Sequence, residues 1–221
     1  MVYGRPALAV PVRALSARAV VQAAPLAEPG SVWIQAPDIE LEAWLSDLPA
    51  GHPLAAALRG VLQALHIPRA PACKVRLHST IPIASGLGSG AAASVALIRA
   101  FAAFLGRPLE PEQVSAIAYE VEKLYHGTPS GIDNTVIAYE MPVFFVRGDP
   151  NRIERLSVAR PFDLLIADTG IPSPTAVAVG DLRQAWLGDR ERYEALFDRV
   201  GEIARQARQV LEAGDPQALG P

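Results

Sequence analysis

The sequence is poor in the residues on which several classes of protein depend. Its 221 residues include one cysteine, Cys73, which excludes both an internal disulfide framework and a cysteine-rich metal site. The only lysines are Lys74 and Lys123, so few candidates exist for a catalytic lysine. The formal net charge is −3, from 20 basic and 23 acidic residues, and neither half carries a basic block. Nucleic acid is therefore disfavoured as the main partner.

Long apolar runs are also missing. The uninterrupted apolar stretches fall far short of the ~20 residues that span a bilayer, and the N-terminus lacks the charged and apolar regions of a signal peptide. Half of the residues are nevertheless apolar and 19% are charged, which is a globular composition with enough apolar surface for a core. We therefore expect a soluble cytoplasmic protein that binds no membrane.

Apolar periodicity predicts a mixture of strands and helices. Strands are expected at 7–12, 32–35, 74–78, 135–139 and 143–146, with a further apolar run at 162–167. Helices are expected at 53–66, 91–105, 111–125, 175–187 and 192–212. The second of these helices is apolar nearly all round and should be buried. Beyond about residue 158 the predicted elements are mainly long helices, so we expect an α+β first domain (1–158) and a helix-rich second portion (159–221).

A glycine-rich segment separates the strand at 74–78 from the buried helix. It contains Gly86, Gly88 and Gly90 within the run Ala84-Ser85-Gly86-Leu87-Gly88-Ser89-Gly90. Glycines permit positive φ and close backbone approach, so several N–H groups can converge on an anion where the helix begins. Phosphate is the natural ligand, although the segment matches neither the Walker loop nor the dinucleotide fingerprint. The alternative is a tight turn that holds a core helix against a sheet.

A second candidate site combines Glu122 with Asp133 and the loop between them. Two carboxylates flanking such a loop could hold Mg²⁺ and accept a proton, because Mg²⁺ prefers one or two carboxylates together with phosphate oxygens. A hydroxyl group that attacks a phosphoryl group benefits from this arrangement. The alternative is that Glu122 forms an ion pair and that Asp133-Asn134 makes an Asx-type turn.

Taken together, these segments resemble motifs of the GHMP kinase superfamily. Residues 82–92 are similar to its ATP-binding motif, and Glu122 with residues 126–134 is similar to the active-site loop of its mevalonate kinase branch. Residues 2–10 resemble the end of the family's first motif, and 167–175 falls where the family places a strand and a helix start. The resemblance implies an α+β fold with a ribosomal protein S5 domain 2-like N-terminal domain and an incomplete ferredoxin-like C-terminal domain.

The resemblance also implies a reaction and the residues that carry it. ATP would donate its γ-phosphoryl group to the 5-hydroxyl of mevalonate, with Mg²⁺ as cofactor. Asp133 would act on that hydroxyl as general base or orienter, and Glu122 would ligate Mg²⁺, with Ser89 as a second candidate ligand. Mevalonate would lie near His126, Ser130, Gly131 and Thr175. ATP would be bound by Ser79, Ala84, Ser85, Gly86, Leu87, Gly88, Ser89, Gly90 and Ala91.

Three departures from the family pattern bear on activity. The family's second serine after Gly-Leu-Gly, which ligates magnesium, is Gly90 here, so Ser89 or water would take its role. The lysine and the Glu-His pair of the first motif would precede Met1, and the C-terminal glycine-rich motif is missing. The chain thus resembles a piece truncated at both ends, and we expect it alone to be inactive or barely active.

Other functions remain open at this stage. Another kinase of the superfamily would act on phosphomevalonate, homoserine or a sugar. A non-catalytic nucleotide-binding remnant would bind ATP without transferring phosphate, and a structural α+β domain would bind no ligand. A homodimer is expected only by analogy with the family.

Overall fold

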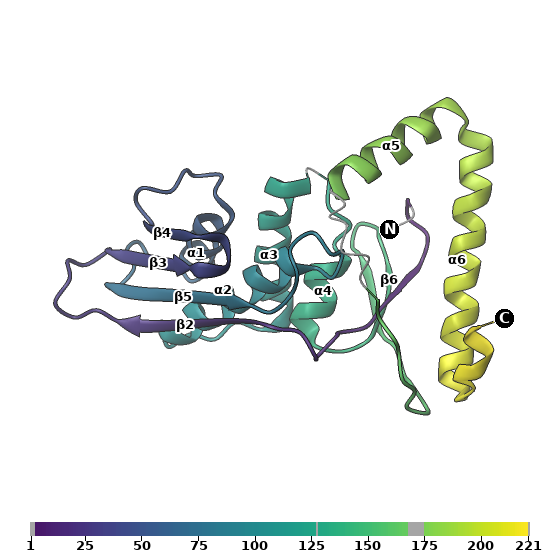
Figure 1. Cartoon of the computed structure of the whole chain (residues 1–221), viewed down its shortest axis with the longest axis horizontal. Helices are drawn as coiled ribbons and strands as arrows, with labels where there is room; N and C mark the ends of the chain where they lie inside the picture. The colour runs from purple at the N-terminus through teal and green to yellow at the C-terminus, as the bar shows by residue number, and fades with distance from the viewer. Residues whose placement is uncertain (1–2, 127, 168–174, 221) are drawn as a thin grey trace.

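The computed structural model describes residues 3–126, 128–167 and 175–220. Within these residues the chain forms two sheets and six α-helices (Figure 1). The strands are β1 (Ala7–Ala9), β2 (Ala17–Ala23), β3 (Val32–Ala36), β4 (Leu41–Trp44), β5 (Cys73–Ser79), β6 (Val143–Val146) and β7 (Arg152–Arg155). The helices are α1 (Pro53–Ala64), α2 (Ser89–Phe104), α3 (Pro111–His126), α4 (Ile132–Tyr139), α5 (Thr175–Gly188) and α6 (Arg190–Ala213), with short 3-10 turns at Pro37–Ile39 and Pro216–Leu219.

A four-stranded sheet carries the main core on one face. Its strand order is β2-β5-β3-β4, with β3 and β5 parallel and the other neighbours antiparallel. Strand β5 alternates as a half-buried strand should, because Cys73, Val75 and Leu77 are buried while the residues between them are exposed. Helices α1 and α2 pack against the buried face (Figure 1). Burial raises the pKa of the Cys73 thiol to about 11, which fits a packing role.

Helix α2 runs through the centre of this core. Its buried residues occupy most of its circumference, and Leu97, Ile98 and Phe101 are completely enclosed. The prediction of a buried helix at 91–105 is therefore confirmed. Its first residue, Ser89, lies within the glycine-rich segment, so this buried helix fixes the position of that segment.

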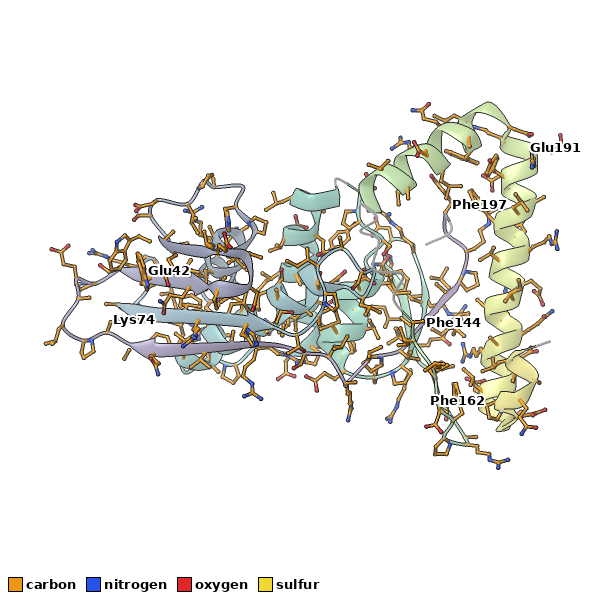
Figure 2. All side chains as sticks on the ribbon, viewed as in Figure 1. Glu42, Lys74, Phe144, Phe162, Glu191 and Phe197 are labelled. Atoms are coloured by element: carbon orange, nitrogen blue, oxygen red, sulfur yellow. The ribbon has the colours of Figure 1, made fainter. Side chains whose placement is uncertain are left out.

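The second sheet joins the N-terminal strand to the last helix. Its order is β1-β6-β7, and α6 lies along it (Figure 1). Arg5 forms ion pairs with Glu194 and Asp198 of α6, and the Phe197 ring stacks on Tyr3. Figure 2 shows Phe144 and Phe197 between α6 and the sheet. No helix within 3–126, 128–167 and 175–220 is both long and apolar enough to cross a bilayer.

The predicted strand at 135–139 is wrong, because those residues belong to helix α4. The β-branched residues of this segment favour a strand locally. The helix forms instead because Gly131 takes a left-handed conformation (φ 86°) as its N-cap and Thr135 Oγ1 bonds back to the Gly131 carbonyl oxygen. Packing against α3 and α2 then outweighs the local preference.

Other boundaries also differ from the predictions. Strand β1 ends at Ala9, short of residue 12, and the strands β2, β4 and β7 were not predicted. The apolar run 162–167 has no regular structure, and Leu165 there is 98% exposed. The predicted helices at 53–66, 111–125, 175–187 and 192–212 and the strands at 32–35, 74–78 and 143–146 are confirmed to within a few residues. The domain boundary near 158 stays a prediction.

Gly60 provides a test of how tightly α1 and α3 approach each other. A Cβ at this position would lie 2.7 Å from Ile117 Cγ2. We expect Gly60→Ala to lower the free energy of unfolding by about 1–2 kcal/mol, because overpacking outweighs the gain in helix propensity. Urea unfolding measures this change. The control is Gly180→Ala in α5, where an added Cβ meets nothing within 4 Å, and which should be neutral or stabilising. Equal effects of the two substitutions would contradict the close approach.

Candidate active site

The glycine-rich segment is held at its entrance by hydrogen bonds from two directions. The backbone N–H of Ser79, the last residue of β5, donates to Asp38 Oδ2 at 2.7 Å. The N–H of Thr80 donates to the carbonyl oxygen of Ser16 at 2.9 Å. Farther on, Ser85 Oγ donates to the Pro82 carbonyl oxygen at 2.8 Å. The segment is therefore an ordered loop between β5 and α2.

The loop ends in a helix N-terminus that has no side-chain cap. Gly88 is the N-cap of α2 in a left-handed conformation (φ 69°), and as a glycine it forms no side-chain cap hydrogen bond. The first bond of the helix runs from the N–H of Ala92 to the carbonyl oxygen of Gly88. The N–H groups of residues 89–91 therefore have no acceptor within the helix, and the positive end of the helix dipole lies in the same place. This arrangement suits an anion.

Both candidate carboxylates lie against this loop. A Cβ built on Gly90 would lie 3.5 Å from Glu122 Oε1, and one built on Gly88 would lie 3.7 Å from Asp133 Cβ. Glu122 comes from α3, and Asp133 stands in the first turn of α4. The structure thus brings together the glycine-rich segment and residues of α3 and α4, which lie more than 30 residues further along the sequence. The alternative in which Asp133-Asn134 makes an Asx-type turn is wrong, because both residues are helical.

Glu122 is in an unusual environment for a carboxylate. Its side chain lies on the flank of the apolar stripe of α3, and the residue is only 5% exposed. Burial, together with the negative charge of Asp133, raises the pKa of Glu122 to about 7. By contrast, Glu120 on the same helix is exposed and pairs with Lys123. Two neighbouring carboxylates, one of them buried, form a site that a cation would stabilise.

The donor set fits a magnesium ion that is held partly by substrate. In the described ranges no group of three or more His, Cys, Asp or Glu side chains gathers in a metal-binding arrangement. Mg²⁺ needs no such cage, because it is commonly bound by one or two carboxylates with phosphate oxygens and water. Glu122 and Asp133 beside an uncapped helix N-terminus supply the carboxylates and a place for the phosphates.

A cavity of about 570 Å³ opens beside the glycine loop. Asp133 and the loop residues 86–88 form part of its wall, and the ion pair between Arg99 and Glu140 forms another part. The remaining walls are mostly apolar and come from residues 9–17, α2 and α4. A ligand with phosphate groups at the loop could therefore place an apolar or ring portion in this cavity.

The other residues predicted to bind substrate or ATP lie at the ends of helices and strands. Ser130 and Gly131 lie at the start of α4, where Ser130 Oγ accepts a hydrogen bond from the N–H of Ile132 at 3.2 Å. Ser79 lies at the end of β5, at the entrance to the loop. His126 ends α3 and Thr175 begins α5, but their side chains lie outside the described part of the chain, as does the predicted motif at 168–174.

Sequence reasoning missed the polar residues that support the site. Asp38, Ser115 and Thr135 were not singled out, and Asn134 was predicted only as part of the family motif and of an Asx-type turn, yet each forms hydrogen bonds next to a predicted site residue. One signal was available for Ser115, because it follows the buried Val114 on the apolar side of an amphipathic helix. No local pattern indicated the others.

Comparisons with known proteins identify relatives of the chain. The family model described as "GHMP kinases N terminal domain" matches residues 53–140. A mevalonate kinase from Aeropyrum pernix is 34% identical over 148 residues, which cover 66% of this chain and 45% of the relative. A mevalonate kinase from Thermococcus sibiricus is 30% identical over 226 residues, which cover 96% of this chain and 66% of the relative. The chain therefore spans less than two thirds of the length of the first and about two thirds of the second.

A solved structure gives the same result at the level of the fold. The crystal structure of L. major mevalonate kinase in complex with R-mevalonate superposes with a TM-score of 0.65 at 26% identity, over 93% of this chain and 62% of that one. The fold is therefore the GHMP kinase fold, as the sequence predicts.

The pKa of Glu122 makes stability depend on pH. Its carboxyl has a pKa of about 7 in the folded protein against 4.5 ordinarily, so the folded state holds this proton more tightly than the unfolded state does. The resulting contribution to the free energy of unfolding is complete below pH 4.5 and is lost as the pH rises through 7. We expect Glu122→Gln, unfolded by urea in chelator-treated buffer, to remove a decline of roughly 3 kcal/mol between pH 4.5 and 8. Glu120→Gln, an exposed neighbour, should leave the decline intact. Parallel profiles for wild type and Glu122→Gln would contradict the assignment.

Proposed function

The chain belongs to the GHMP kinase superfamily, and from that premise we propose that its protein transfers the γ-phosphoryl group of ATP to the 5-hydroxyl of mevalonate. The observation that carries the proposal is the position of Glu122 and Asp133 against the uncapped N-terminus of α2. Phosphoryl transfer needs a cradle for phosphate, a cation and a group that orients the attacking hydroxyl. All three requirements find residues at this one place.

The backbone of residues 84–91 binds the ATP phosphates in this proposal. The N–H groups of residues 89–91 donate to phosphate oxygens, and the dipole of α2 favours their negative charge. Ser79 fixes the entrance of the loop through its bond to Asp38. The base and ribose of ATP then have the apolar cavity beside the loop available to them.

Glu122 would hold Mg²⁺, with Ser89 as a further ligand, and the ion would supply positive charge to balance the transferred phosphate. An ion near Glu122 also accounts for a buried carboxylate next to Asp133, since a divalent cation would favour the ionised form that burial disfavours. ATP and Mg²⁺ binding are thereby coupled at this site. The metal should lower the pKa of Glu122.

Asp133 orients the attacking hydroxyl or accepts its proton. It lines the cavity next to the loop, in the first turn of α4. Ser130 and Gly131, which precede that helix, would contact the same substrate, and His126 and Thr175 would complete the proposed mevalonate contacts. The resemblance of residues 126–134 to the mevalonate kinase loop and the relatives of that name support mevalonate as the acceptor.

Activity tests this proposal directly. We expect the protein expressed from its complete gene to release ADP in a mevalonate-dependent manner, and Asp133→Asn to lower kcat by about 10²–10⁴-fold with little change in ATP affinity. Asp47→Asn, a change in an exposed turn, is the control. Phosphomevalonate, homoserine and sugars should be poor acceptors. ATP binding without transfer to any of them would instead indicate a non-catalytic remnant.

Gly90 allows a gain-of-function test of the magnesium site. Space exists for a Cβ, at ordinary contact distance from Glu122 Oε1, so Gly90→Ser can present a hydroxyl beside that carboxylate. We expect Gly90→Ser to lower the Mg²⁺ concentration needed for half-maximal ATP binding by about fivefold, the effect of one additional hydrogen-bond-sized interaction. Gly90→Ala, which adds the same Cβ without the oxygen, should not. A fluorescent ATP analogue titrated at several Mg²⁺ concentrations distinguishes them, and equal responses would contradict this geometry.

A further inference from the structure

A buried polar network joins α3 to α4 next to the two carboxylates. Asn134 Nδ2 donates to the carbonyl oxygen of Ser115 at 3.0 Å and to its hydroxyl oxygen at 2.9 Å. Thr135 Oγ1 donates to the Gly131 carbonyl oxygen at 2.6 Å and lies 3.4 Å from Ser115 Oγ. The three residues are 8%, 4% and 2% exposed in the order Ser115, Asn134, Thr135. We refer to them as the α3–α4 polar network.

The network links the two helices that carry the site. Ser115 and Glu122 are seven residues apart on α3, which is about two turns, so both lie on the side that faces α4 and the loop. Asn134 directly follows Asp133 on α4, and successive helical residues point about 100° apart. When Asn134 points into α3, Asp133 is therefore turned toward Gly88, where it is found.

Directional bonds define the register of α4 more sharply than apolar contacts do. The apolar residues buried along these two helices include Val114, Ala118, Val136 and Ala138. Apolar contacts are non-directional, so a small slide or rotation changes their energy less than it changes that of a hydrogen bond. A buried Asn that donates to one carbonyl and one hydroxyl loses both bonds on such a movement, and unpaired buried polar groups are costly.

We propose that Ser115, Asn134 and Thr135 are positioning residues that fix the register and rotation of α4, so that Asp133 faces the phosphate loop and Glu122 at the spacing needed for phosphoryl transfer. The bond from Thr135 to Gly131 fixes, in addition, the end of the loop that contains Ser130. The kinetic part of this inference rests on the proposed function. The structural part concerns α4 alone and can be measured without turnover.

The variants that test the network change one group at a time. Thr135→Val keeps the shape of the side chain and removes its hydroxyl, whereas Thr135→Ser keeps the hydroxyl. Ser115→Ala removes one oxygen from a helix and introduces the best helix-forming residue. Ser94→Ala is the matched control, because Ser94 is also buried, at 2% exposure, but lies on α2 outside the network.

The kinetic readout is the separation of kcat from ATP affinity, measured on the protein from its complete gene. We expect Thr135→Val and Ser115→Ala to lower kcat at least tenfold, since a misplacement of about 1 Å can cost 10²-fold, with the ATP dissociation constant within twofold of wild type. Thr135→Ser should retain most of the wild-type kcat, and Ser94→Ala should not lower it. A network that matters only for folding would not separate kcat from binding in this way. Unchanged kcat in both variants, or an equal loss in Ser94→Ala, would overturn the proposal.

The structural readout is amide hydrogen exchange over residues 130–136. Thr135→Val and Ser115→Ala should exchange faster there than wild type, and Ser94→Ala should not. If wild type transfers phosphate to no acceptor, the proposed function fails, and exchange alone decides the positioning role. If Thr135→Val does not fold, Ser115→Ala carries both measurements. Wild-type exchange rates in the variants that fold would overturn the proposal.

Discussion

The close approach of α4 to the N-terminus of α2 is the contact on which the rest of the site depends. It occurs at Gly88, whose φ of 69° disfavours other residues and whose hydrogen faces Ile137 and Asp133. A side chain there would both strain the backbone and separate the two helices. Because the helix dipole weakens within its first turn, a shift of one residue would remove Asp133 from the part of the loop where we propose that phosphate binds. The distance of Asp133 from the glycine loop therefore depends on the close approach of the backbone at Gly88.

Charge balance explains why the site accommodates two acidic side chains. Both α2 and α4 begin at a left-handed glycine without a side-chain cap, so two positive helix ends meet near the carboxylates. These partial charges do not fully compensate Glu122, whose pKa is raised to about 7. In the proposed function, a divalent cation would supply positive charge next to the carboxylates, and a phosphate group would supply negative charge next to the helix ends. Such a site would bind the two together better than either alone.

Elements could be predicted from the sequence where the local pattern and the tertiary structure favour the same conformation. Helix α2 and the glycine loop could be predicted, because an all-apolar helix after closely spaced glycines has few other arrangements. Helix α4 could not, since its β-branched residues favour a strand and the bonds that make it a helix run to Gly131 and Ser115. The bonds of Asn134 and Thr135 could not be predicted either, because Asn and Thr beside a loop are common turn residues. The apolar run 162–167 predicts burial that the described structure does not show.

Gly88 and Gly90 stand two residues apart, yet only one of them is required by the backbone. Gly90 has no positive φ, and an added Cβ would be at ordinary contact distance from its neighbour. A glycine inside a helix costs about 0.5–1 kcal/mol relative to alanine, so neither conformation nor packing favours it here. Its effect is chemical, because this position beside Glu122 carries no hydroxyl. In the proposed function, a cation at Glu122 would complete its coordination with Ser89, phosphate oxygens or water. Metal binding would then depend more on the nucleotide than it would with serine at this position.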